Sequence, residues 1–254
     1  MGEMEQGDRQ TMKERRIPVL ELFGPTVQGE GMVIGRKTLF VRTAGCDYSC
    51  AWCDSAFTWD GSAKDEVQWM DAFEIVDRLA ELGGSSFGHV TLSGGNPALI
   101  EALGGLIGLL HDRGVEVAVE TQGSKFQEWL LQVDQLTLSP KPPSSGMKTD
   151  WAVLDKVAAE VTGQRSSGIS LKVVVFDEKD LDYALAVHRR YPSIPFYVQA
   201  GNDELSEQDP AVLRDRLVSR YEWLVEQVMS NDELRQVHVL PQLHAWLWGN
   251  KRGV

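Results

Sequence analysis

Cys46-Asp-Tyr-Ser-Cys50-Ala-Trp-Cys53 is the most informative stretch of this 254-residue chain. It follows a strand-like run at 37–43 and contains all three cysteines of the sequence. An odd number of cysteines within one short loop does not suit a disulfide framework, which requires pairs. Three thiolates from one loop can instead bind a metal or an iron–sulfur cluster and leave one coordination position open, as catalysis requires.

The alternative at these cysteines is a structural zinc ion whose fourth ligand is a histidine. The histidines of the chain are His89, His111, His188, His238 and His244. None of them has the spacing to the cysteines that zinc-finger motifs show, where the ligands cluster closely along the chain. The zinc hypothesis, in which the chain is a non-enzymatic interaction module, therefore lacks its fourth ligand.

Strand-like and helix-like segments alternate on both sides of the loop. The expected strands are 17–23, 37–43, 89–93, 115–120, 135–138, 169–176, 196–199 and 236–240, and the expected helices are 71–82, 97–113, 126–133, 150–161, 180–191 and 210–229. This alternation is typical of an α/β fold with a parallel sheet. About six repeats fall short of the eight of a complete barrel, so we predict a partial TIM-like barrel with its site at the C-terminal ends of the strands.

The sequence predicts one folded domain after a short tail. Residues 1–16 are polar and aperiodic, which indicates a disordered N-terminal tail. Residues 17–254 contain no internal repeat and no clear linker, so we expect them to form a single domain.

The charge balance and the hydrophobic pattern restrict the partners. With 25 Lys and Arg against 37 Asp and Glu, the net charge of −12 argues against binding to nucleic acid or to an anionic membrane. No apolar run reaches the ~18 residues of a membrane span, and the N-terminus lacks the apolar region of a signal peptide. We therefore expect a cytoplasmic protein whose thiols stay reduced.

The C-x3-C-x2-C spacing resembles that of the radical SAM superfamily, in which an aromatic residue typically precedes the third cysteine, as Trp52 does here. Ser93-Gly-Gly-Asn-Pro97 stands where that superfamily usually has Gly-Gly-Glu-Pro, so Asn96 replaces a glutamate. Glycines allow a ligand to approach the backbone closely. The resemblance implies a [4Fe–4S] cluster with S-adenosylmethionine on its open iron. The cluster ligands would be Cys46, Cys50 and Cys53.

Further motifs resemble the 7-carboxy-7-deazaguanine synthase family. They are Gln28-Gly-Glu-Gly31, Phe40-Val-Arg-Thr-Ala-Gly-Cys46, Cys53-Asp-Ser55, Glu120-Thr-Gln-Gly123, Ser139-Pro-Lys141 and the C-terminal run 241–254. The resemblance covers 17–254 and implies a radical SAM core with a family-specific C-terminal extension. It implies ring contraction of 6-carboxy-5,6,7,8-tetrahydropterin to 7-carboxy-7-deazaguanine, with loss of ammonia and S-adenosylmethionine as a recycled cofactor. It also implies Mg2+, a homodimer and a flavodoxin-type electron donor.

The resemblance further implies which residues form the site. Substrate contacts are expected from Val27, Gln28, Gly29, Glu30, Arg42, Ser93, His244 and Val254. Contacts to S-adenosylmethionine are expected from Trp52, Asp54, Gly95, Asn96, Ser139, Pro140, Lys141, Gln199, Ala200, Gly201 and Asn202. The magnesium ligand would be Ser55, where family members often have threonine. No side chain is expected to act as a catalytic acid or base, because the radical comes from the cofactor.

The residue types suit these roles. A glutamate and a glutamine can bind the hydrogen-bonding edge of a guanine-like ring, and an arginine binds a carboxylate through two hydrogen bonds. Mg2+ keeps water and substrate oxygens as ligands, so one protein ligand suffices.

A second enzymatic hypothesis is a radical SAM activase that generates a glycyl radical on a partner protein. The short chain and the cysteine loop permit this function. It predicts a broad protein-binding surface and no requirement for Mg2+ or a pterin.

Overall fold

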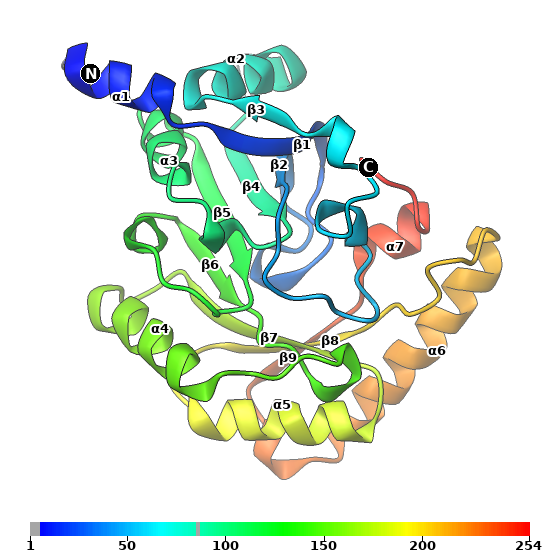
Figure 1. Ribbon diagram of the computed structural model, residues 1–254. Helices are drawn as coiled ribbons and strands as arrows, with labels where there is room; N and C mark the ends of the chain where they lie inside the picture. Colours follow the sequence, from blue (N-terminus) through cyan, green and yellow to red (C-terminus); the bar gives the residue numbers. More distant parts are fainter. Residues whose placement is uncertain (1–5, 85–86) are drawn as a thin grey trace.

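The strands form one curved, open sheet in the computed structural model, which describes residues 6–84 and 87–254 (Figure 1). Within these residues the sheet has nine strands in the order β3-β1-β2-β4-β5-β6-β7-β8-β9. They are β1 (Ile17–Val27), β2 (Lys37–Thr43), β3 (Gln68–Met70), β4 (His89–Gly94), β5 (Glu116–Thr121), β6 (Gln135–Leu138), β7 (Ile169–Val175), β8 (Phe196–Ala200) and β9 (Val237–Leu240).

The strand directions agree with the predicted fold class. Neighbouring strands from β2 to β9 are parallel, whereas β1 runs antiparallel to both β2 and β3. Because β3 and β9 stand at opposite ends of the order and do not pair with each other in the described residues, the barrel is partial. The prediction of an unclosed α/β barrel is confirmed.

Helices cover the outer face of the sheet (Figure 1). The α-helices are α1 (Gln6–Glu14), α2 (Ala72–Gly83), α3 (Leu103–His111), α4 (Trp151–Gln164), α5 (Glu178–Arg190), α6 (Pro210–Met229) and α7 (Leu243–Trp248). Short 3-10 helices lie in the loops: η1 (Gly31–Val33), η2 (Ala56–Thr58), η3 (Lys64–Glu66), η5 (Pro97–Leu99), η6 (Glu128–Leu131), η7 (Pro143–Ser145) and η8 (Asp232–Leu234). Across the described parts of the chain, no helix is long and apolar enough to span a membrane.

Aspartates fix the first residues of several helices. At the start of α2, Asp71 accepts hydrogen bonds from the backbone N–H groups of Phe73 and Glu74, while its own N–H donates to Glu74 Oε2. Asp150 and Asp209 cap α4 and α6 through their side chains. Such caps satisfy N–H groups that have no partner within the helix, so the local sequence sets where these helices begin.

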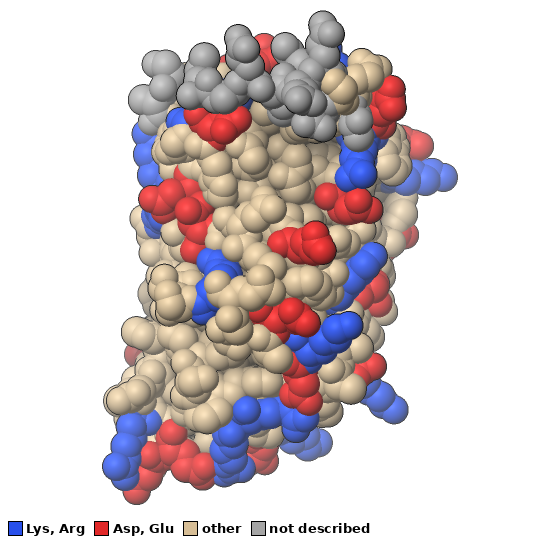
Figure 2. All heavy atoms as spheres, turned by 90° about the vertical axis from the view of Figure 1, so that its left-hand side faces the viewer, with Lys and Arg blue, Asp and Glu red and all other residues tan. Residues whose placement is uncertain are grey.

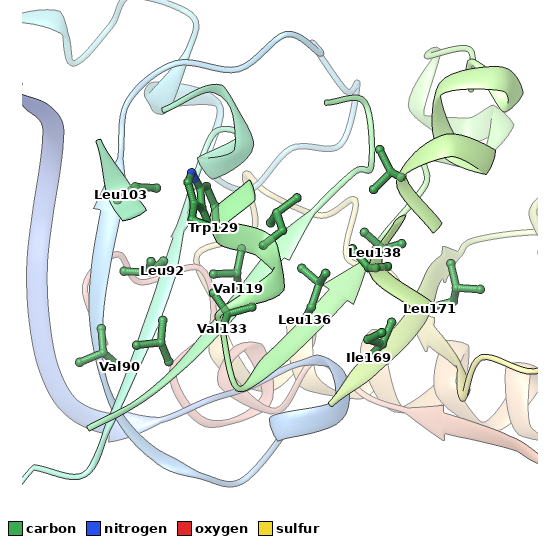
Figure 3. Close-up of a cluster of buried hydrophobic side chains, with 14 of the residues drawn as sticks. Val90, Leu92, Leu103, Val119, Trp129, Val133, Leu136, Leu138, Ile169 and Leu171 are labelled. Carbon is green, nitrogen blue, oxygen red and sulfur yellow. The ribbon is translucent and has the colours of Figure 1, made fainter. Parts of the chain in front are cut away.

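The apolar core lies between the sheet and the outer helices. Side chains alternate along a strand, so on β7 Leu171 and Val173 belong to this core while Lys172 lines the opposite, inner side. Figure 3 shows a part of the core in which Trp129 lies beside Val119, above the strands β4 to β7. The core therefore holds the strands in place from the outside and leaves the inner side of the sheet free for other groups.

The inner side of the sheet is polar. The Oγ1 atoms of Thr38 on β2 and Thr91 on β4 lie 3.1 Å apart. Thr137 on β6 and Ser170 on β7 form a hydroxyl pair at 3.0 Å. Because these buried groups satisfy one another, the interior of the partial barrel can remain polar up to the strand ends, where it opens into a cavity.

The N-terminal segment differs from the predicted disordered tail. Gln6–Glu14 form α1, and Met12 packs against the main core beside Gly105 of α3. An apolar side chain within an otherwise polar segment can be buried and so hold a short helix in place. The expectation of disorder does not hold for this helix, and residues 1–5 lie outside the described residues.

Two predicted helices are shorter than expected, and several short elements were not predicted. The segment 97–113 is divided into η5 and α3, and 126–133 contains only η6. In η6 the indole N–H of Trp129 donates to the carbonyl of Ile100 at 3.1 Å, so a tertiary contact overrides the helical pattern. Besides α1 and the short 3-10 helices, the elements missed include the three-residue strand β3 and α7, which lies in the C-terminal run 241–254.

The face seen from the left of Figure 1 carries charges of both signs. Figure 2 shows Lys and Arg interspersed with Asp and Glu among the described residues of that face. Nucleic-acid binding requires a continuous basic patch. This face therefore does not offer one.

Candidate active site

A cavity of about 330 Å³ lies at the C-terminal ends of the parallel strands. It collects residues from distant parts of the sequence. Of the residues predicted to form the site, it brings together Val27, Gln28, Gly29, Glu30, Arg42, Cys46, Cys50, Trp52, Cys53, Asp54, Ser55, Ser93, Gly95, Lys141, Asn202, His244 and Val254. Ser93 contributes a buried hydroxyl without a hydrogen-bond partner among the described residues, as expected of a group that binds a ligand.

Six predicted residues do not line this cavity; they are Asn96, Ser139, Pro140, Gln199, Ala200 and Gly201. Asn96 is fully buried, caps η5 and donates to Asp47 Oδ1 at 2.9 Å. Ser139 accepts a hydrogen bond from Lys141 at 3.2 Å. The amide of Gln199 is buried with neither polar atom bonded among the described residues, so it retains capacity for a ligand. Their contacts to S-adenosylmethionine stay predictions.

The cysteine loop is held against the end of β4 by backbone contacts. Gly94 has φ +128°, and a Cβ at Gly94 would overlap the carbonyl oxygen of Thr43. A Cβ at Gly95 would overlap the carbonyl oxygen of Gly45, which also accepts a hydrogen bond from Asn96 N at 2.8 Å. The two glycines are therefore needed to bring this strand end onto the start of the loop.

Hydrogen-bond donors surround the sulfur atoms. Tyr48 N lies 3.4 Å from Cys46 Sγ, and the indole Nε1 of Trp59 lies 3.4 Å from Cys53 Sγ. Burial raises the pKa of Cys50 to about 11 and also raises the pKa values of the other two thiols. Because a bound metal would hold these groups as thiolates, N–H groups aimed at sulfur fit the electron-rich ligands of an iron–sulfur cluster.

The spacing of the sulfurs also bears on which metal they fit. Among the described residues, Glu30, Asp54 and His244 are the trio of ligand side chains whose atoms lie within 4.8 Å of one another, and the cysteines are not such a trio. The thiolates of one tetrahedral zinc ion would lie about 4 Å apart at ordinary zinc–sulfur distances. In a four-iron cluster, each thiolate binds its own iron, so a wider spacing is suitable.

Lys172 is a site residue that sequence reasoning missed. Its side chain is 1% exposed, and its Nζ lies 2.5 Å from Glu30 Oε2 and 2.8 Å from Glu120 Oε2. Burial alone would lower the pKa of Lys172, but the two carboxylates outweigh burial and raise it. Conversely, burial alone would raise the pKa of Glu30, but Lys172 and His244 lower it overall. A lysine within a strand of β-branched residues was the available signal.

His244 lies between two carboxylates. Its Nδ1 is 3.9 Å from Glu30 Oε1, and its Nε2 is 3.8 Å from Asp54 Oδ2. Burial alone would lower the pKa of His244, but Asp54 and Glu30 outweigh it, so the pKa is raised. Gly29 lies against this imidazole, where a Cβ would overlap Nδ1. The position of His244 therefore depends on the missing side chain at residue 29.

Arg42 connects the cavity to a second acidic residue. Its Nη1 donates to Ser55 Oγ at 2.7 Å, and its Nε forms an ion pair with Glu21 Oε2 at 2.7 Å. Ser55 Oγ in turn donates to Asp54 Oδ1 at 3.1 Å. Two neighbouring ligands of an octahedral Mg2+ lie about 3 Å apart, so the oxygens of Ser55 and Asp54 fit one edge of such a site.

Comparison with known proteins supports these assignments at the level of family. The profile of the Radical SAM superfamily matches residues 40–139. The chain is 57% identical over 239 residues to 7-carboxy-7-deazaguanine synthase of Bacillus cereus, covering 94% of this chain and 99% of that protein. It is 56% identical to the enzyme of the same name from Bacillus subtilis (strain 168), covering 94% and 98%.

A solved structure shares the fold. The crystal structure of QueE from Escherichia coli aligns with a TM-score of 0.66 at 20% sequence identity, covering 94% of this chain and 100% of that chain. At this identity the similarity concerns the fold, which is the same open α/β barrel.

Proposed function

Since this chain belongs to the 7-carboxy-7-deazaguanine synthase family of radical SAM enzymes, we propose that its cavity is where 6-carboxy-5,6,7,8-tetrahydropterin undergoes ring contraction to 7-carboxy-7-deazaguanine. The reaction releases ammonia, and S-adenosylmethionine acts as a recycled cofactor. The main support is that one cavity joins the cysteine motif to Glu30, Arg42 and His244, which come from both ends of the chain. The names of the relatives do not favour a glycyl-radical activase or a zinc module.

The cysteine loop would hold the cofactors. Cys46, Cys50 and Cys53 would ligate the [4Fe–4S] cluster, with the backbone of Gly95 beside them in the cavity wall. When bound, the cluster and S-adenosylmethionine supply the radical that starts the reaction. Trp52 packs against Phe176 with the ring centroids 5.0 Å apart and the planes tilted by 41°, and it would form an apolar wall for the cofactor.

The opposite side of the cavity would hold the substrate. Glu30, kept ionised by Lys172, would accept hydrogen bonds from the N–H groups of the pterin ring. Arg42 would bind the substrate carboxylate with its guanidinium. His244, whose pKa is raised by its two neighbouring carboxylates, would donate a hydrogen bond to a ring oxygen or nitrogen. Each of these side chains binds and orients the ring and leaves the chemistry to the cofactors.

We further propose that Mg2+ binds Ser55 and the neighbouring carboxylate of Asp54, on the side of the substrate carboxylate. Cluster-binding thiols suit the reducing cytoplasm. Electron delivery by a flavodoxin-type protein and assembly into a homodimer are proposed from the family alone.

One anaerobic assay tests the function. The reconstituted protein is given a reductant, S-adenosylmethionine, Mg2+ and 6-carboxytetrahydropterin, and the deazaguanine product is followed by mass spectrometry. Product with little net consumption of S-adenosylmethionine supports the proposal. Deoxyadenosine without product, from a protein loaded with iron, would contradict it and direct the search to another substrate.

The same assay tests the magnesium site. We expect Ser55→Ala to raise the Mg2+ concentration needed for half-maximal rate about tenfold, and Ser55→Thr to keep it near the wild-type value because the hydroxyl remains. Ser230→Ala removes an exposed hydroxyl at the end of α6 and serves as the control. Equal Mg2+ dependence of all three variants would contradict the assignment of Ser55 as a Mg2+ ligand.

A further inference from the structure

The C-terminal segment Gly249–Val254 lies across the opening of the barrel between β9 and β1. All six of its residues line the cavity. Figure 1 shows the C-terminus next to β1, on the far side of the opening from the strand β9 that precedes α7. The segment therefore connects the β9 side of the opening to β1 at the site.

One anchor holds this segment to the β8–α6 side. The side chain of Asn250 accepts a hydrogen bond from Asn202 Nδ2 at 2.8 Å. Its own Nδ2 donates to the carbonyl oxygens of Glu204 at 2.9 Å and Glu207 at 3.1 Å. The amide of Asn250 thus uses both its donor and its acceptor capacity on one loop.

A second anchor, Arg252, holds the segment to the opposite side. Its guanidinium pairs with Glu21 of β1 and, at 2.8 Å, with Glu66 Oε2. The guanidinium carbon also lies 4.0 Å from the ring centroid of Phe57. Arg252 therefore contacts two carboxylates and one aromatic ring. A planar guanidinium can bind carboxylates at its edge and an aromatic ring at its face at the same time.

Arg252 and Arg42 share one carboxylate. Glu21 offers Oε1 to Arg252 and Oε2 to Arg42, and its side chain is 16% exposed. Phe57 also lies near both, with the guanidinium carbon of Arg42 5.5 Å from its centroid. Arg252 holds Oε1 of Glu21, while Oε2 lies 2.7 Å from Arg42 Nε without the geometry of a hydrogen bond. Nη1 of Arg42 is directed to Ser55 Oγ instead.

We propose that Arg252 is a positioning residue for the reaction: it latches Gly249–Val254 over the cavity and, through Glu21, fixes the orientation of Arg42 toward the substrate carboxylate. Without Arg252, both oxygens of Glu21 are free to bind the Arg42 guanidinium and turn it from the cavity. The part concerning Arg42 rests on the proposed function. The latch itself rests only on the contacts of Asn250, Arg252 and their partners.

Steady-state kinetics test the orientation of Arg42. We expect Arg252→Ala to raise KM for the pterin about tenfold with kcat changed less than about twofold, because binding geometry is lost but the reacting atoms are untouched. Arg252→Lys keeps the charge without the fork, so its KM should lie between those of the wild type and Arg252→Ala. Arg235→Ala is the matched control and should leave both constants unchanged, because Arg235 is exposed and, among the described residues, pairs only with Asp232.

Proteolysis tests the latch independently of turnover. Endoproteinase Lys-C cuts after Lys251, which is present in wild type and in Arg252→Ala, and the fragments are followed by mass. We expect cleavage at this bond about tenfold faster in Arg252→Ala than in wild type or Arg235→Ala, because the segment must detach before it is cut.

The two readouts separate the possible failures. Equal cleavage rates in wild type and Arg252→Ala overturn the latch, whether or not the protein makes deazaguanine. Faster cleavage with an unchanged KM overturns the positioning of Arg42. A wild type that makes no product contradicts the proposed function, and in that case the cleavage rates still decide the latch.

Discussion

Lys172 Nζ lies 2.5 Å from Glu30 Oε2, although 142 positions separate the two residues in the sequence. The contact joins the middle of β7 to the loop after β1. It also connects the polar interior of the barrel to the side of the cavity where the pterin ring is proposed to bind. The positive charge of Lys172 thus holds the Glu30 carboxylate from the barrel interior beneath the site. Lys172 itself is 1% exposed.

We expect Lys172→Met to reduce the free energy of unfolding by about 3 kcal/mol, because removing the buried ammonium leaves the partly buried carboxylates of Glu30 and Glu120 without compensation. Anaerobic urea unfolding at neutral pH measures the loss. Lys125→Met removes an exposed lysine and should change the free energy of unfolding by less than about 0.5 kcal/mol. Equal stability of both variants would show that Glu30 and Glu120 do not depend on Lys172.

Gly29→Ala should disrupt the site without unfolding the protein. The added Cβ overlaps His244, and the carbonyl of Gly29 accepts a hydrogen bond from Leu243 N at 3.0 Å, so α7 must shift. We expect kcat/KM to fall about 100-fold, as for displacements of about 1 Å in other sites. Gly108→Ala is the control, because its Cβ meets nothing within 4 Å and α3 should gain about 0.5–1 kcal/mol. Wild-type kcat/KM in Gly29→Ala would contradict the placement of His244.

Asn96→Asp should destabilise the protein by about 2–4 kcal/mol. Asn96 Nδ2 donates to Asp47 Oδ1 at 2.9 Å and to Ser124 Oγ at 3.0 Å, and an aspartate would place a buried negative charge against Asp47. Asn231→Asp is the matched control, since Asn231 caps η8 by accepting from Glu233 N, which aspartate does equally well. Thermal unfolding of the two variants gives the comparison, and similar midpoints would refute this account of Asn96.

His89 should make stability depend on pH. Burial lowers the pKa of His89 to about 4, from an ordinary value of 6.5. The stability that its neutral form allows is therefore present above pH 6.5 and is lost as the pH falls toward 4, by about 3 kcal/mol at most. We expect the difference in unfolding free energy between wild type and His89→Leu to shift by this amount between pH 7 and pH 4. A difference that does not vary with pH would show that His89 is not held neutral.

The alternating strands and helices were predictable because each element carries its own local signal. The predicted segment 210–229 coincides with α6, whose start is fixed by Asp209 and Pro210. Segment 126–133 was predicted as a helix from its spacing, but there the Trp129 side chain bonds to the distant carbonyl of Ile100. The local sequence pattern contains no information about a competing tertiary hydrogen bond, so the helix prediction failed at the segment that forms one.

Many residues of the site could be predicted from the sequence, but the contacts between them could not. The cysteine spacing and the family motifs named the residues that meet in the cavity, because those residues are contiguous in short runs. Lys172 lies outside these motifs, and Arg252 lies within the C-terminal run 241–254 but is not among the residues predicted to form the site. Lys172 and Arg252 matter because they pair with Glu30 and Glu21, respectively. A single sequence carries no signal of pairing between residues more than 100 positions apart.

The bridge from Gly249–Val254 to β1 has a consequence for how the protein is made. Translation proceeds from the N-terminus, so Glu21, Gly29 and Glu30 leave the ribosome long before the C-terminal residues that contact them. A nascent chain that ends before residue 242 holds the sheet strands and the cysteine loop but lacks His244 and Arg252. The cavity is therefore completed only after Arg252 has been synthesised, and a shorter growing chain has no enclosed site in which to bind its substrate.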